Sequence, residues 1–418
     1  MCGIDQGPCG VCGMITIERL NMRAEGVAQG LAVARALPGE VVEGDITDAR
    51  MARPQILLPS PDRVAAPCRH YKACGGCALM HASDGFVARW KHEVVEQALA
   101  AQGLETLFRP LQTSPARCRR RATLTGRRLK SGALVGFHGR ASDSLTAIPD
   151  CHLLDPALLA MIPALEELVI AGASRKAEVK FTVLVVDQGV DVAVTGGKPL
   201  DDALRFSLPQ IAGRHGLARL AWDGEVMAQP APPTVPMGRA RTVPPPGAFL
   251  QATPQGEAAL LAAVVDAVGP ARRIADLFAG CGTFSLPLAQ SAEIHAAEGS
   301  APMMQALDQA WRNTPGLKRI STEARDLFRR PLLPDELAGF DAVVIDPPRA
   351  GAGAQVAELA RAAVPVIAAV SCNPVSFARD ARVLCAAGYT LDWVQVIDQF
   401  RWSAHVELTA RFSCAGRA

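Results

Sequence analysis

Asp276-Leu277-Phe278-Ala279-Gly280-Cys281-Gly282-Thr283-Phe284 is the stretch of sequence that decides the fold. It closes an apolar run and opens a helical pattern. Gly280 and Gly282 let the backbone approach a ligand closely, and the start of the following helix offers free N–H groups. The next apolar run ends in Glu298, whose carboxylate can accept hydrogen bonds from both hydroxyls of a ribose. The stretch therefore predicts a cofactor site at the first strand-to-helix turn of an α/β sheet.

Apolar strands alternate with Ala-rich helical patterns from about residue 255 onward. The strand candidates are Ile274–Phe278, Ile294–Glu298, Ala342–Asp346 and Val364–Val370. This alternation predicts a mostly parallel, doubly wound α/β sheet. A dinucleotide-binding turn would read G-x-G-x-x-G, but Ser285 stands at the third glycine position. The single D-x-F-x-G-x-G turn instead resembles that of S-adenosylmethionine-dependent methyltransferases, and a structural glycine turn in another α/β domain is the alternative.

The chain of 418 residues is long enough for two or three domains. Short alternating runs at Ile15–Leu20, Val27–Ala34 and Val41–Ile46 predict a small β-barrel at the N-terminal end. Two proline-rich stretches, near residues 54–67 and 230–247, mark boundaries. We therefore expect an OB-like barrel over 14–66, a central α+β domain over 67–247, and the doubly wound, Rossmann-like domain over 248–418.

The net charge of the whole chain does not indicate a binding partner, because 43 Lys and Arg are balanced by 41 Asp and Glu. Residues 106–142, however, hold nine Arg or Lys and no Asp or Glu. The Arg117–Arg121 run, with Arg127, Arg128 and Lys130, is a candidate surface for nucleic-acid phosphates, and a solvated charged face is the alternative. No secretory signal and no apolar run of about 18 residues is visible, so we expect a cytoplasmic protein with no membrane partner.

Two motifs follow neighbouring strand candidates in the C-terminal domain. Asp346-Pro347-Pro348-Arg349 is similar to the D-P-P motif of enzymes that methylate an exocyclic amine of a base, but Arg349 replaces the aromatic residue expected there. Ser371-Cys372-Asn373-Pro374 places a cysteine where α/β sheets hold their ligands, and a thiolate there is an effective nucleophile. A small buried core residue is the alternative for Cys372.

A carboxylate lies late in the chain, at Glu407 in an apolar run, where an unpaired charge would be costly. A solvent-facing strand residue is the alternative. Carbon 5 of uracil is too weak a nucleophile to accept a methyl group, but a thiolate added at carbon 6 makes it enolate-like. A base must then remove the carbon 5 proton so that the thiol is expelled. Cys372, the Gly280–Thr283 turn and Glu407 supply the nucleophile, the methyl-donor site and the base.

Together these motifs resemble the RNA 5-methyluridine methyltransferase family, in particular its iron–sulfur-containing 23S rRNA branch, over nearly the whole chain. The resemblance implies that Cys372 is the nucleophile and Glu407 the base. Phe249-Leu250-Gln251-Ala252-Thr253 matches the family's F-x-Q-x-N cofactor motif except for Thr253. The residues implied to bind S-adenosylmethionine are Gln251, Phe278, Gly280, Gly282, Thr283, Glu298, Asp326 and Asp346.

Four of the twelve cysteines are expected to bind metal. Clustered cysteines in a cytoplasmic chain indicate metal or catalysis, and the Cys68-x5-Cys74-x2-Cys77 cluster needs a fourth ligand. The family resemblance implies a [4Fe–4S] cluster held by Cys68, Cys74, Cys77 and Cys151, which organises the RNA-binding domain. A zinc site made by the first three cysteines and His81 is the alternative. Cys2, Cys9 and Cys12 fall outside the pattern, and Met14 is a candidate natural start.

Residues 14–58 resemble a TRAM domain, an OB-like barrel that binds RNA in this family. A base must leave its stack to reach Cys372, and Phe137 and Phe400 are candidates to receive it. We expect a monomeric enzyme that methylates carbon 5 of a uridine in 23S rRNA. Transfer RNA is the alternative substrate. A non-catalytic iron–sulfur RNA-binding protein and an amine-directed methyltransferase are the alternative classes.

Overall fold

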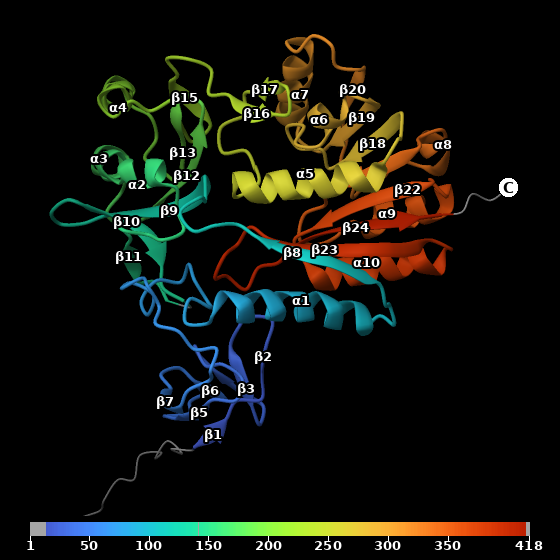
Figure 1. Ribbon diagram of the computed structural model, residues 1–418. Helices are drawn as coiled ribbons and strands as arrows, with labels where there is room; N and C mark the ends of the chain where they lie inside the picture. Colours follow the sequence, from blue (N-terminus) through green and yellow to red (C-terminus); the bar gives the residue numbers. More distant parts are fainter. Residues whose placement is uncertain (1–13, 141, 415–418) are drawn as a thin grey trace, which may run out of the picture.

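The protein was studied as a computed structural model that describes residues 14–140 and 142–414. Figure 1 shows a small β-region at the N-terminal end, a central sheet, and a large α/β sheet that carries most of the C-terminal half. Cys2, Cys9 and Cys12 lie outside the described residues. None of the helices within the described ranges is long and apolar enough to cross a membrane.

The N-terminal region consists of two small sheets, with strand orders β1-β5-β7 and β2-β3-β4-β6. The run expected as one strand over 27–34 is a hairpin. Gln29 and Gly30 both have positive φ (49° and 81°), which is the backbone of a tight turn between two short strands. The strands are β1 (Ile15–Thr16), β2 (Arg19–Leu20), β3 (Gly26–Ala28), β4 (Leu31–Val33), β5 (Val41–Glu43), β6 (Arg50–Met51) and β7 (Gln55–Leu58).

The central region is a seven-stranded sheet with the order β11-β10-β9-β12-β13-β14-β15. The strands are β9 (Arg121–Arg128), β10 (Ala133–His138), β11 (Leu145–Ala147), β12 (Val179–Val186), β13 (Gly189–Thr195), β14 (Arg219–Trp222) and β15 (Glu225–Ala228). The helices are α2 (Pro156–Ala160), α3 (Ile162–Gly172) and α4 (Asp202–Arg214). Phe181, Leu165, Leu208 and Trp222 are buried in the core between them. The proline-rich stretch that follows forms a hairpin of β16 (Val235–Met237) and β17 (Ala240–Thr242).

The C-terminal region is an eight-stranded sheet with the order β20-β19-β18-β21-β22-β24-β23-β8. Strands β18 to β22 are parallel, as the alternating pattern predicts, and β24 is antiparallel to both of its neighbours. These strands are β18 (Arg273–Leu277), β19 (Glu293–Glu298), β20 (Ile320–Ala324), β21 (Ala342–Ile345), β22 (Val366–Ser371), β23 (Thr390–Asp398) and β24 (Glu407–Ser413). The helices are α5 (Pro254–Val268), α6 (Ser285–Leu288), α7 (Ala301–Arg312), α8 (Pro334–Leu337), α9 (Gly353–Ala362) and α10 (Pro374–Ala386).

One strand and one helix of this region come from far upstream. β8 (Leu107–Thr113) pairs in parallel with β23, and α1 (Asp84–Ala100) lies along α10 and β23. Figure 1 shows β8 at the edge of the sheet, with α1 below it. Ser83 begins α1 by accepting a hydrogen bond from the Phe86 backbone N–H. The C-terminal sheet therefore includes elements from the interval that the sequence assigns to the central domain.

The strand directions create one edge where chemistry-bearing residues meet. The carboxyl ends of β18 to β23 and of β8 lie at this edge, and the antiparallel β24 begins there. Residues that follow five different strands, and the first residue of β24, are thus brought together from distant parts of the chain.

Candidate active site

The glycine turn after β18 leaves open space beside a carboxylate. Gly280 and Gly282 have φ of 57° and 97°, and a Cβ added at Gly280 would meet no atom within 4 Å. Glu298, at the end of β19, accepts hydrogen bonds from the backbone N–H groups of Gly280 (3.3 Å) and Ser300 (2.9 Å). The carboxylate therefore holds the turn, and the backbone at Gly280 stays open to close approach by a ligand.

Phe278 adopts a left-handed backbone conformation (φ 62°), which is rare for a bulky residue. Its ring lies 5.4 Å from the ring of Phe328, between centroids, and the neighbouring Asp326 is exposed. One oxygen of Asp326 accepts the Phe328 backbone N–H at 3.0 Å. The residue that leads into the glycine turn is thus packed against the segment that carries Asp326. Thr283 is half-buried and makes no side-chain hydrogen bond within the described residues.

Four side chains form a continuous hydrogen-bonded group beside the turn. Gln399, directly after β23, donates to Gln251 Oε1 (2.6 Å) and to Glu407 Oε2 (2.9 Å). Gln251 Nε2 in turn lies 3.4 Å from Asp346 Oδ2. The sequence singled out three of these residues and missed Gln399. Its position directly after a strand at the ligand-binding edge points to it, but that position becomes visible only when the strands are placed in order.

Burial dominates the electrostatics of this group. It raises the pKa of Glu407 to about 7, against the opposing hydrogen bond from Gln399. Burial and the nearby Glu407 raise the pKa of Asp346 well above its usual range. The pKa of Cys372 is raised to about 11 by burial and by the charges of Glu407 and Asp346, while Arg349 opposes that shift. The structure therefore brings Cys372, Glu407 and Asp346 within electrostatic reach of one another.

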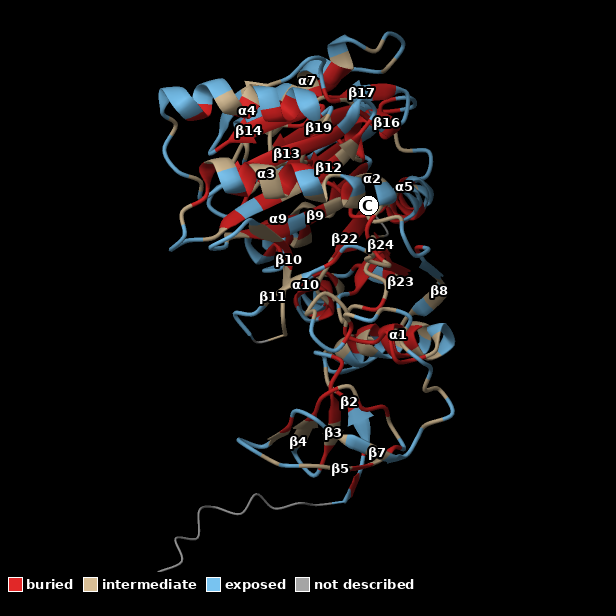
Figure 2. Ribbon diagram, turned by 90° about the vertical axis from the view of Figure 1, so that its left-hand side faces the viewer, coloured by how far each residue is buried: buried red, intermediate tan, exposed pale blue. Residues whose placement is uncertain are grey.

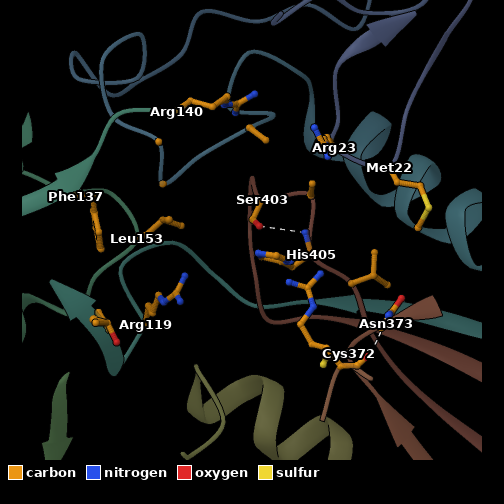
Figure 3. Close-up of a pocket in the computed structure, with 18 of the residues that line it drawn as sticks. Met22, Arg23, Arg119, Phe137, Arg140, Leu153, Cys372, Asn373, Ser403 and His405 are labelled. Carbon is orange, nitrogen blue, oxygen red and sulfur yellow. Dashed lines mark hydrogen bonds between the residues drawn. The ribbon is translucent and has the colours of Figure 1, made fainter. Parts of the chain in front are cut away.

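Cys372 lines a cleft of about 720 Å³ to which all three regions contribute. Figure 3 shows Cys372 and Asn373 on one side of this cleft, His405 and Ser403 next to them, and Arg119 and Phe137 across from them. Figure 2 shows the N-terminal sheets below α1 and apart from the two large sheets. The arginines that line the cleft are Arg23, Arg50, Arg119, Arg121, Arg140 and Arg349. Such a cleft suits a polyanion with a reactive group at the thiol.

The arginines of the basic segment over 106–142 differ in their surroundings. Arg119, Arg121 and Arg140 line the cleft. Arg120 and Arg127 instead form ion pairs with Glu257 and Glu178, two acids that lie far away in the sequence. A stretch without acids therefore does not leave all of its arginines free, because folding supplies partners from elsewhere.

Cys68, Cys74, Cys77 and Cys151 line one small, enclosed cavity with apolar neighbours such as Met80 and Ile148. Backbone N–H groups of Gly76 and Leu153 point at the sulfurs of Cys74 and Cys151 (3.4 and 3.5 Å). In the described ranges no three His, Cys, Asp or Glu side chains converge on a point that would hold a single metal ion. Thiolates of a four-iron cluster bind different iron atoms, so they stand farther apart than ligands of one ion. The donor set fits the cluster, which stays a prediction.

His81, the alternative zinc ligand, does not line the cysteine cavity. Its Nδ1 lies 2.6 Å from the Tyr71 hydroxyl, and it borders a different cavity. Burial also lowers the pKa of His81 to about 3, so the ring is neutral. The arrangement favours Cys151 over His81 as the fourth member of the cysteine group.

Comparisons with known proteins agree on one family. Residues 245–412 match the family model described as tRNA (uracil-5-)-methyltransferase. A Rhizobium meliloti protein described as an uncharacterized RNA methyltransferase is 42% identical over 95% of this chain and 98% of its own. The 23S rRNA (uracil(1939)-C(5))-methyltransferase RlmD of Halomonas elongata is 34% identical over 94% of this chain and 88% of its own.

The fold has a close counterpart among solved structures. The Pyrococcus abyssi tRNA (uracil-54, C5)-methyltransferase, in complex with S-adenosyl-L-homocysteine, superimposes with a TM-score of 0.76. The match covers 96% of this chain and 99% of that chain at 21% identity. The Rossmann-like α/β region and the regions before it therefore share one overall architecture with that enzyme.

Proposed function

The chain belongs to the RNA (uracil-5-)-methyltransferase family, and on that premise we propose that it methylates carbon 5 of a uridine in 23S rRNA through a covalent adduct with Cys372. The observation that carries the proposal is the convergence of Cys372 and Glu407 on one sheet edge, with Cys372 in an arginine-lined cleft. A uracil base delivered into this cleft meets the Cys372 thiol, and the buried Glu407 carboxylate lies within electrostatic reach of that sulfur.

In the proposed mechanism Cys372 releases its proton to solvent in the cleft and its sulfur bonds to carbon 6 of the uracil. The electron pair of the carbon 5–carbon 6 double bond moves toward carbon 5, which becomes nucleophilic. S-adenosylmethionine, when bound, supplies the methyl group that carbon 5 takes. Glu407 then removes the proton from carbon 5, the carbon 5–carbon 6 double bond re-forms, and the electron pair of the carbon–sulfur bond returns to Cys372. A pKa of about 7 suits Glu407 to this step, because a base works best when its pKa lies near the working pH.

The open corner at Gly280 and Glu298 fits the methyl donor. The space above Gly280 is free of side chains, and Glu298 presents a carboxylate where a ribose would lie. We propose that Gln251, Phe278, Gly280, Gly282, Thr283, Glu298, Asp326 and Asp346 hold it.

Two variants separate the roles of the nucleophile and the base. Cys372→Ala is expected to abolish methyl transfer while S-adenosylmethionine binding persists. Glu407→Gln is expected to trap a covalent RNA adduct, seen as a gel-shifted band that survives denaturant, because expulsion of the thiol stops. Wild-type turnover in the first variant, or full activity without adduct in the second, would remove that residue from the mechanism.

The choice of 23S rRNA over tRNA rests on the similarity to RlmD. The N-terminal sheets do not discriminate, because the P. abyssi tRNA enzyme shares the whole architecture. Mapping 5-methyluridine in both RNAs after deletion of the gene decides between them. We expect one uridine of 23S rRNA to lose its methyl group, and loss from tRNA alone would favour the alternative substrate.

We also propose that Cys68, Cys74, Cys77 and Cys151 hold a [4Fe–4S] cluster with a structural role. Residues within two positions of these ligands, Gly75, Gly76 and Leu153 among them, line the substrate cleft, so a cluster would fix one wall of it.

The cluster proposal predicts a brown protein with about four iron atoms per chain after anaerobic purification. Cys151→Ser is expected to lose iron and RNA binding. Cys118→Ser, which changes a cysteine outside the cavity, is expected to keep both. A colourless protein with one zinc per chain would contradict the proposal.

A further inference from the structure

We infer that Gln399 is a positioning residue that holds the base Glu407 and the cofactor contact Gln251 in one fixed geometry. The inference rests on the proposed function, because those two residues have these roles only in methylation of carbon 5. Gln399 is 2% exposed and lies directly after β23, between the two residues that it joins.

The orientation of the Gln399 amide is set by a backbone group. The Ala252 N–H donates to Gln399 Oε1 at 2.8 Å. A backbone N–H can only donate, so the atom that faces it must be the oxygen. The amide nitrogen then points the other way, and its two N–H groups go to Gln251 Oε1 (2.6 Å) and Glu407 Oε2 (2.9 Å). Both N–H donors of Gln399 are therefore used within the site.

This orientation has a consequence for the base. Within residues 14–140 and 142–414, Glu407 receives a side-chain hydrogen bond at Oε2 and none at Oε1. Oε1 is thus the atom left to take the proton from carbon 5. A hydrogen bond to a carboxylate favours its charged form, which is the form that acts as the base. The charged groups near Glu407 are Asp346 after β21 and, around Cys372, Arg349.

A second consequence concerns the cofactor side. Because Gln399 occupies Gln251 Oε1, the amide nitrogen of Gln251 turns toward Asp346 Oδ2 (3.4 Å). Two amides therefore stand between two buried carboxylates that would otherwise repel each other. The base and the proposed cofactor contacts are parts of one hydrogen-bonded chain.

Gln399 itself is anchored by its neighbours. The preceding Asp398 forms a buried ion pair with Lys91 of α1 (2.5 Å) and accepts the Phe400 backbone N–H at 3.0 Å. The backbone at the end of β23 is therefore held on both sides of Gln399, and the amide itself is held by its three hydrogen bonds within the site.

Gln399→Met tests the inference in the full-length protein, with Gln395→Met as the matched control. Gln395 is a buried glutamine of β23 that donates to the Pro110 carbonyl of β8, away from the site. Single-turnover methylation is measured across pH, together with the fraction of denaturant-resistant RNA adduct. Losing a hydrogen bond to a charged group corresponds to roughly one to two pH units. We expect the methylation rate of Gln399→Met to reach its plateau roughly one to two pH units higher than that of the wild type. Expulsion of the Cys372 thiol should be roughly tenfold slower or more, so the covalent RNA adduct should accumulate.

Gln399→Glu is a second variant that keeps the size of the side chain, in case Gln399→Met fails to fold. The carboxylate still accepts the Ala252 N–H, but it cannot donate to Gln251 or Glu407, and it adds a third negative charge. A larger alkaline shift than in Gln399→Met is expected, with a several-fold weaker apparent affinity for S-adenosylmethionine. Gln395→Met is expected to keep the wild-type pH profile and adduct level.

Gln399→Met with an unchanged pH profile and no adduct would overturn the inference, and so would the same shift in Gln395→Met. Glu407→Gln is assayed in parallel. If Glu407→Gln keeps full activity, the proposed mechanism fails. If Glu407→Gln traps the adduct while Gln399→Met behaves as wild type, only the role of Gln399 fails.

Discussion

Asp276 is the most completely buried carboxylate of the cofactor turn, with no exposed surface. Its Oδ2 accepts a hydrogen bond from the Ser285 hydroxyl at 2.5 Å, and its Oδ1 has no partner within the described residues. Burial raises the pKa of Asp276 to about 7. The first residue of the motif that decides the fold therefore stabilises the turn best when it is protonated.

A pH-dependent stability follows from this pKa. An unfolded aspartate titrates near pH 4, so the folded protein binds the extra proton between about pH 4 and pH 7. The wild-type free energy of unfolding should fall as pH rises through this window, by roughly 1.4 kcal/mol for each unit of pKa difference. Asp276→Asn removes this contribution. Denaturant unfolding of both proteins at several pH values should show the variant gaining relative stability toward pH 7, and parallel curves would contradict the assignment.

At the residue scale, the sequence indicates which residues carry the chemistry better than it indicates their hydrogen-bond and ion-pair partners. The motifs around Cys372 and Glu407 are local, and local patterns are visible in one stretch of sequence. Gln399 is different, because its three hydrogen-bond partners lie 8 to 148 positions away in the chain. No spacing rule indicates such a residue before the strands are placed in order. The same reason explains Arg120, whose acidic partner Glu257 lies in α5.

At the scale of elements, α1 and β8 bind the upstream chain to the C-terminal sheet. Ser83 caps α1 through a local contact, but nothing local predicts that β8 would pair with β23 rather than with its sequence neighbours β9 and β10. Pairing between distant strands depends on the rest of the sheet being formed. The contact between α1 and the C-terminal sheet is strengthened by Lys91, which is 0% exposed. Lys91 donates hydrogen bonds to Asp398 of β23 and to the Phe400 carbonyl.

Lys91→Met should be strongly destabilising, because it leaves Asp398 buried without its cation. We expect a loss of roughly 3–5 kcal/mol in the free energy of unfolding. The double variant Lys91→Met/Asp398→Asn should recover part of that loss, since the buried charge is gone. Lys176→Met, at an exposed lysine, serves as control and should stay within about 0.5 kcal/mol of wild type. Equal stability of Lys91→Met and the control would show that the pair contributes little.

At the scale of the whole molecule, two cavities flank the cysteine segment. The substrate cleft lies on one side. On the other side the N-terminal sheets and the segment around Tyr71 enclose a second cavity of about 610 Å³, whose basic residues are Arg35, Arg53, Arg63 and Lys72. Arg63 is paired with the buried Glu40, but Arg35, Arg53 and Lys72 have no acidic partner within the described residues. No Asp or Glu lines this cavity, so it suits RNA phosphates that continue beyond the cleft.

The double variant Arg53→Gln/Lys72→Gln tests whether RNA reaches the second cavity. Each lost phosphate contact on a single strand should reduce the slope of log affinity against log salt by roughly 0.7. The rate of methylation at saturating RNA should stay unchanged, because neither residue lies in the cleft with Cys372. Arg205→Gln is the control, since Arg205 is exposed on α4 and paired with Glu225 far from both cavities. A salt slope equal to that of the control would confine the RNA to the cleft, whereas a reduced slope would make the N-terminal sheets part of the substrate path.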